Sequence, residues 1–110
     1  MKKLVNILLE KNYIYKSLHE IDIKTLGTRK KIKIYEGVDP KSYYTSIFVL
    51  NQKSRFLRKN ADDLESLYEK LKVVQDHNFK HKLLIYQMPL CSKAKALMKE
   101  RGWRFINASV

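Results

Sequence analysis

The sequence predicts an α/β domain with a mixed central sheet flanked by helices, in the order helix, three strands, helix, strand, helix, strand. Two patterns support this order: three segments have apolar residues at helical spacing, and the segments between them alternate or run continuously apolar, as strands do. A chain of 110 residues, 45% of them hydrophobic, can bury one core. Only three glycines and two prolines are present. We therefore expect residues 1–110 to form a single domain without a linker.

The first half of the chain is expected to form one helix and three strands. Residues 2–18 carry a helical stripe of apolar side chains, which are Leu4, Val5, Leu8, Leu9, Tyr15 and Leu18. From His19 the period changes to two, which predicts a β-hairpin with Gly27 at its turn. A second turn is expected at 37–40, and the third strand at 43–56.

The second half is expected to form helix, strand, helix and strand. Asn60 is a good N-cap for the first of these helices, with two aspartates placed to favour its first turn. Residues 83–86 read as a short buried strand. Ser92 can cap the next helix and Gly102 can end it. Residues 103–106 then close the sheet.

The net charge of +12 is unevenly distributed along the chain. Residues 1–60 contain 14 Lys and Arg against five Asp and Glu, and no acidic residue occurs between Lys41 and Ala61. Such a field attracts polyanions, with nucleic acid as the expected partner. Three classes remain open: a nucleic-acid-binding module, a metal-dependent nuclease, and an interaction protein whose basic face meets an acidic protein. The sequence also leaves a homodimer open.

The most informative stretch is the third strand together with the basic segment after it. The apolar run at 47–50 is typical of a strand buried on both faces, and it passes directly into that basic segment. Strand alternation places Asn51, Lys53 and Arg55 on one side. We expect phosphate contacts from this segment and from the hairpin, through Lys53, Arg55, Arg58, Lys59, Lys30, Lys31 and Lys33.

The element order, with an acid near the second strand and a lysine in the third, resembles the PD-(D/E)xK, or restriction-endonuclease-like, nucleases. Residues 82–106, KLLIYQMPLCSKAKALMKERGWRFI, also look like the strand–helix–strand of the single-strand and branched-DNA endonucleases in that group. The shared pattern is Pro-x-x-x-Lys-Ala-Lys-x-Leu-x-x-x-x-Gly. The resemblance implies a restriction-endonuclease-like fold over nearly the whole chain.

In that family, two acids on adjacent strands hold Mg²⁺, and a lysine two residues after the second acid stabilises developing charge. The resemblance places Asn51 and Lys53 at the (D/E)-x-K position, so an amide replaces the second acid. Glu36, or alternatively Asp39, would be the first carboxylate and metal ligand. The catalytic set implied is thus Glu36, Asn51 and Lys53, with Mg²⁺ as cofactor only if the domain is active. We expect little or no metal-dependent cleavage.

A second register of the same motif is open. Asp22 and Glu36 would then be the two acids, and Val38 would stand where the lysine belongs. Each register lacks one member of the set. The resemblance therefore implies a nuclease-like domain that binds nucleic acid with a degenerate or weakly active site.

The cysteine and the histidines suggest no other chemistry. Residues 89–91 resemble the end of the Cys-Pro-x-Cys motif of glutaredoxins, but Met88 stands at the nucleophile position. Cys91 is the only cysteine, which fits a reducing, cytoplasmic compartment. His77 and His81 are expected in a loop, without the ligands of a zinc site. The start of the chain is expected to be a helix, not a signal peptide, and no apolar run is long enough for a membrane span.

Overall fold

The computed structural model describes residues 2–26, 32–50 and 55–108. Within them the chain forms α1 (Lys2–Glu10), β1 (Ser17–Ile21), a short 3₁₀ helix η1 (Ile23–Leu26), β2 (Ile32–Val38), β3 (Tyr44–Leu50), α2 (Arg58–Gln75), β4 (His81–Tyr86), α3 (Ser92–Glu100) and β5 (Trp103–Asn107). The predicted α/β class and element order are confirmed.

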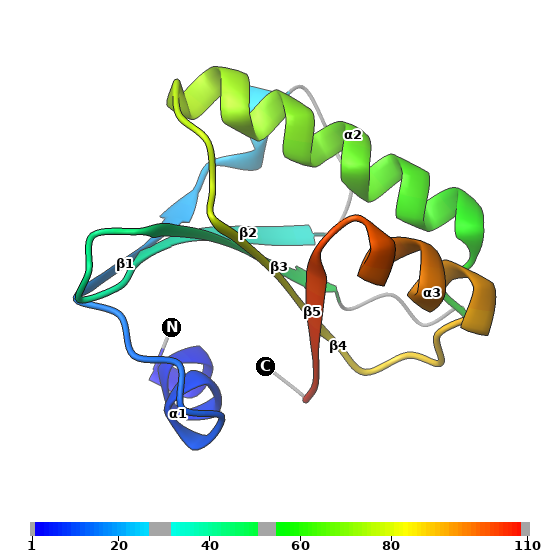
Figure 1. Cartoon of the computed structure of the whole chain (residues 1–110), viewed down its shortest axis with the longest axis horizontal. Coiled ribbons are helices and arrows are strands. Elements are labelled where there is room, and N and C mark those ends of the chain that lie inside the picture. The colour runs from blue at the N-terminus through cyan, green and yellow to red at the C-terminus, as the bar shows by residue number, and fades with distance from the viewer. Residues whose placement is uncertain (1, 27–31, 51–54, 109–110) are drawn as a thin grey trace.

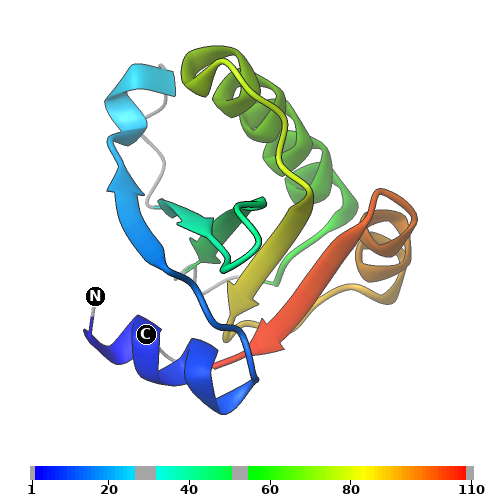
Figure 2. The ribbon, with the colours of Figure 1, turned by 60° about the vertical axis from the view of Figure 1, so that its left-hand side comes forward.

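The five strands lie in one sheet in the order β1-β2-β3-β4-β5. The first three strands pair antiparallel, and β3, β4 and β5 pair parallel, so the sheet is mixed as expected. Helix α1 covers one face of the sheet, and α2 and α3 cover the other, giving three layers (Figures 1 and 2). Every residue from Thr45 to Leu50 is buried, which explains the continuous apolar run of β3.

Each face of the sheet has its own hydrophobic cluster. On the α1 side, Leu4 and Leu8 pack with strand residues such as Ile47 and Ile85. The α2 side is larger and includes Phe48, which meets Trp103 edge to face with ring centroids 5.2 Å apart. The indole Nε1 of Trp103 donates to Glu65 of α2 at 2.9 Å, which ties that helix to β5. None of the helices in the described ranges is long and apolar enough to cross a membrane.

The predicted first helix is too long. It ends at Glu10, because Asn12 takes a left-handed conformation (φ 64°) and the Tyr13 N–H returns to the Leu8 carbonyl at 2.8 Å. The chain then turns back, and residues 17–21 pair with β2 as a strand. The apolar periodicity predicted a helix as far as residue 18 because Leu18 fits a helical stripe and a strand equally well.

The hairpin region also differs in detail. After Ile21 the chain enters η1, where Asp22 Oδ1 accepts the Lys24 N–H at 3.0 Å, so the first strand ends earlier than predicted. The predicted turn at Gly27 lies outside the described residues. The second turn starts two residues later than expected: Asp39 Oδ1 accepts the N–H groups of Lys41 and Tyr43, both at 2.9 Å.

Helix α2 starts earlier than predicted. Leu57 is the N-cap, and Asn60 lies inside the first turn, where its side-chain oxygen accepts the Leu57 N–H at 2.8 Å. The predicted long third strand ends at Leu50. Phe56, expected at its end, instead forms a separate bridge with Leu90. Strand β4 begins at His81, so this histidine, expected in a loop, belongs to the sheet.

Candidate functional site

The N-termini of α2 and α3 meet at the edge of the sheet where the parallel strands β3 and β4 end (Figure 1). Two backbone hydrogen bonds join the segments that precede these helices. The Phe56 N–H donates to the Pro89 carbonyl, and the Cys91 N–H donates to the Phe56 carbonyl, both at 2.9 Å. The carboxyl edge of parallel strands is where α/β domains commonly bind ligands. Both helices therefore present their positive ends in one place.

Four exposed cations gather at this edge, and we call them the basic edge: Arg55, Arg58, Lys59 and Lys93. Neither α2 nor α3 has an acidic residue in its first turn. Cations at a helix N-terminus are unfavourable by about 0.3–1 kcal/mol each, since they oppose the helix dipole. An anion bound here would relieve that repulsion.

The thiol of Cys91 reports the same positive field. It lies at the N-cap of α3 and is half-buried. The backbone N–H groups of Ala94 and Lys93 lower the pKa of this thiol, and the nearby charges of Arg55 and Lys93 add to the effect. The same N–H groups and cations that stabilise the Cys91 thiolate would also stabilise a bound phosphate.

The structure places only part of the predicted phosphate-binding set. Three members belong to the basic edge, and Lys33 is exposed at the start of β2, opposite Val49 near the end of β3. Lys33 is thus at the same end of the sheet as the basic edge. Lys30, Lys31 and Lys53 lie outside the described residues. Lys93, which the sequence reasoning did not select, joins the basic edge because α3 begins beside Phe56.

Glu36 lies toward the other end of the β2–β3 pair and faces α2. It is only 5% exposed, as its shared parity with Ile32 and Ile34 predicted. His19 lies opposite on β1, and its Nε2 is 3.0 Å from Glu36 Oε2. His77, after the end of α2, places its Nε2 2.5 Å from Glu36 Oε1, and Gln75 Nε2 donates to Oε2 at 3.4 Å.

We call these four residues the Glu36 cluster. The ring of His77 is further fixed by Tyr44, with the ring centroids 4.0 Å apart. Both oxygens of a carboxylate buried in this way must be hydrogen-bonded, because burying an ion without partners is costly. In the cluster each oxygen has at least one partner.

Mg²⁺ does not fit the described residues around Glu36. On β3, Ser46 lies opposite Glu36, and the next residue on the same face is Phe48, so an apolar ring stands two residues beyond the serine. Asp39 lines a cavity on the α1 face, away from Glu36. Within the described ranges no three His, Cys, Asp or Glu side chains could together hold a metal ion. Mg²⁺ prefers several oxygen ligands, whereas the partners that contact the Glu36 carboxylate in the described residues are nitrogen atoms of His19, His77 and Gln75.

Other members of the implied catalytic set are separated from Glu36 or not described. Asn51 and Lys53 lie outside the described residues, and the last described residue before them, Leu50, pairs with Ile32 at the far end of β2 from Glu36. Asp22, from the second register, follows β1, where its Oδ1 accepts the Lys24 N–H. Val38 pairs with Tyr44.

The sequence reasoning missed both histidines of the Glu36 cluster. His19 could have been found: a strand starting at Ser17, paired antiparallel with β2, places it opposite Glu36. No sequence pattern predicts the contact of His77 with Glu36, because it depends on where the 18-residue helix α2 ends relative to the sheet.

Comparison with known proteins gives the fold. No protein-family profile matches the sequence, and no curated protein does so either. Among solved structures, EndoMS in its apo form is similar, with a TM-score of 0.59 and 16% identity over 99% of this chain. A repair endonuclease from Pyrococcus abyssi gives 0.55 and 16% over 98%, and an EndoMS–dsDNA complex gives 0.52 and 13% over 99%.

This chain spans less than half of each of those proteins, 46%, 46% and 45% of their respective lengths. At such low identity the likeness shows the fold and leaves the activity open. The predicted α/β architecture is thereby confirmed: the described chain shares its fold with part of EndoMS and of the repair endonuclease.

Proposed function

We propose that this domain binds nucleic acid through the basic edge, and that the carboxylate of Glu36 supports the fold instead of metal-dependent cleavage. The observation that carries the proposal is the meeting of two helix N-termini with four exposed cations. Nucleic-acid phosphates would satisfy both the helix dipoles and the cations.

The comparison adds support for the partner class. One neighbour of the same fold was solved as a complex with double-stranded DNA. The net charge of +12 adds a long-range attraction that does not depend on sequence. DNA and RNA share the phosphate chemistry on which the proposal rests, so both are probes.

The decisive experiment measures fluorescence anisotropy of labelled DNA and RNA over a range of salt concentrations. About five phosphate contacts give a log affinity that falls with log salt at a slope near −4.5. The double variant Arg55→Glu/Arg58→Glu should lose about 10–100-fold in affinity at about 100 mM salt and reduce the slope by about 2.

The control is Lys70→Glu/Lys99→Glu, which reverses two exposed lysines on α2 and α3, away from the N-termini of these helices. The total charge change is identical. Equal loss in both double variants would mean that charge acts diffusely and would remove the basic edge from the proposal. No retention of DNA or RNA at low salt would refute nucleic-acid binding and favour an acidic protein partner.

The second half of the proposal is tested with Mg²⁺ and Mn²⁺ on single-stranded, duplex and branched DNA. We expect no cleavage that depends on Glu36. If the natural protein cuts, and Glu36→Gln abolishes cutting while leaving binding intact, Glu36 is catalytic and this half of the proposal is wrong.

A further inference from the structure

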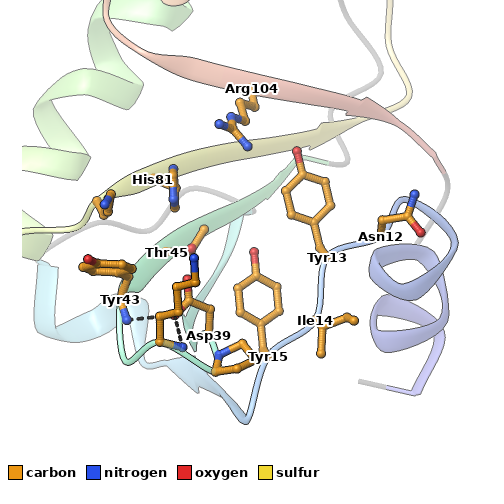
Figure 3. A pocket seen from close by; sticks show the side chains of 12 residues that line it. Asn12, Tyr13, Ile14, Tyr15, Asp39, Tyr43, Thr45, His81 and Arg104 are labelled. Atoms are coloured by element: carbon orange, nitrogen blue, oxygen red, sulfur yellow. Dashed lines mark hydrogen bonds between the residues drawn. The ribbon is translucent and has the colours of Figure 1, made fainter.

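A cavity of about 550 Å³ lies on the α1 face of the sheet, on the opposite face from Glu36. It is bounded by the segment after α1, the turn between β2 and β3, the first residues of β3 and β4, and one residue of β5 (Figure 3). Its volume is in the range of sites that take small molecules. Neither the fold comparison nor the basic edge accounts for it.

Aromatic rings form much of the wall, and one of them is fixed in place. Tyr15 lies against Gly37, where a Cβ atom would come within 2.9 Å of the ring. A larger residue at position 37 would therefore push the ring away. Burial raises the pKa of Tyr15, and the nearby Thr45 side chain opposes this shift in part. This part of the cavity is preformed.

The side chains of Tyr13 and Tyr15 point in the same direction, with their hydroxyl ends toward the strands that carry His81 and Arg104 (Figure 3). Tyr43 closes the other side and is 43% exposed. The cavity thus offers aromatic surface next to cationic groups.

The charge of the lining is positive. Lys41, Lys80 and Arg104 line the cavity with one carboxylate, Asp39, whose Oδ1 already accepts two backbone N–H groups. The Nζ of Lys80 lies 3.7 Å from the centroid of the Tyr43 ring. Burial lowers the pKa of His81, and the charges of Arg104 and Lys80 lower it further. The carboxylate of Asp39 opposes this shift only in part, so Arg104 and Lys80 both lie close enough to His81 to act on the same group.

A second cavity of about 430 Å³, near the end of α2, lacks this combination. Its only lysine, Lys72, forms an ion pair with Glu69 at 2.9 Å, and Asp76 adds negative charge. The juxtaposition of rings and cations thus distinguishes the α1-face cavity from the cavity near the end of α2.

We propose that the α1-face cavity binds a nucleotide, with the phosphate between Arg104 and Lys80 and the base against Tyr13. Base stacking on tyrosine and phosphate contact by arginine and lysine are the chemistry such a ligand requires. The ligand is either a free nucleoside monophosphate or the terminal nucleotide of a strand, which share a base and a phosphate. The inference does not rest on the basic edge, which uses different residues.

The first test is titration of the whole protein with AMP, adenosine and inorganic phosphate, followed by calorimetry or NMR. AMP should bind saturably with a Kd below about 1 mM, and adenosine and phosphate should each bind at least about tenfold more weakly. No saturable AMP binding up to about 10 mM overturns the proposal. Equal affinity for phosphate and AMP also overturns it, since the base would then contribute nothing.

Variants locate the binding. Arg104→Gln should weaken AMP binding about tenfold or more, and Tyr13→Leu should weaken it severalfold. Arg104 is exposed, and a thermal melt checks that the variant remains folded. Lys70→Gln, on α2, and Lys95→Gln, on α3, are controls that should leave AMP affinity unchanged. Unchanged AMP affinity in folded Arg104→Gln refutes the assignment to this cavity.

The two sources are separated with oligonucleotides that carry either a 5′-phosphate or a 5′-hydroxyl. A phosphate-dependent gain in affinity that disappears in Arg104→Gln identifies a strand end as the ligand. Saturable AMP binding without such a gain identifies the free nucleotide. Failure of both arms, together with salt-dependent DNA binding that is sensitive to Arg55→Glu/Arg58→Glu, would refute the cavity proposal and leave the proposed function intact.

Discussion

The two ends of the β2–β3 pair can be compared directly, because each gathers ionisable side chains from several elements. At the amino end of β3, one buried carboxylate is shared among side chains of β1, α2 and the loop after α2. At the carboxyl end, exposed cations converge from the starts of α2 and α3, with no acidic residue in either first turn.

The two ends differ in whether their charged groups interact with other groups of the fold. Glu36 is satisfied by the fold itself, so its interactions contribute to the free energy of unfolding. The basic edge consists of exposed cations at helix N-termini, and their unfavourable interaction with the helix dipoles raises the free energy of the folded state. A buried, partnered acid and an exposed group of cations therefore indicate different roles, even in a fold known from enzymes.

The largest effect on stability is expected at the Glu36 cluster. Glu36→Ala removes the acceptor of two histidines and a glutamine, and the free energy of unfolding should fall by about 1–3 kcal/mol. Chemical denaturation measures it. Glu20→Ala, an exposed acid on the neighbouring strand, is the control and should change stability by less than about 0.5 kcal/mol.

The affinity of folded Glu36→Ala for nucleic acid should equal that of the natural protein. If stability is unchanged and binding is lost, the comparison between the two ends fails, and the carboxylate belongs to a functional site.

A smaller effect, of opposite sign, is expected at the basic edge. Arg58 is the first residue of α2, and Arg58→Glu should increase the free energy of unfolding by about 0.3–1 kcal/mol, since an acid there favours the helix dipole. The same variant should weaken nucleic-acid binding. A parallel loss of stability and affinity would show that Arg58 is held by contacts within the fold.

The smallest effect is kinetic and uses Cys91 as a reporter. Because the pKa of its thiol is lowered, more thiolate is present at pH 7–8 than in an ordinary cysteine, and alkylation by iodoacetamide should be faster than in the unfolded chain. Arg55→Gln should slow the reaction modestly. Bound oligonucleotide should slow it severalfold, by shielding the charge and the sulfur, and mass spectrometry follows the rate. Protection that is equal for a neutral polymer would exclude the electrostatic cause.

The sequence was sufficient for the order of elements and for the burial of Glu36, because both depend on local periodicity. Alternation along β2 is enough to place Glu36 on the same side as Ile34. Boundaries were less accessible: the helix ends at Glu10 because of the backbone conformation at Asn12, which the apolar pattern does not encode. Asn60 looked like a cap, yet it acts from within the first turn.

Contacts between distant segments were the part that local patterns could not give. His77 reaches Glu36 across 41 residues, and Lys93 joins Arg55 only because Phe56 pairs with Leu90. Both depend on the length and packing of α2. The roles of Asn51 and Lys53 remain predictions, as does phosphate contact by the basic edge.

The backbone bridge between Phe56 and Leu90 has a consequence for the entropy of association. It joins the segments that lead into α2 and α3, and Phe56 itself is only 1% exposed, so the two helix starts are held in one arrangement before any partner arrives. Ordering loops and side chains on binding is a major cost of association, and a surface fixed beforehand avoids part of it. Two main-chain hydrogen bonds thus fix the distance between the two helix N-termini that carry the cations of the basic edge.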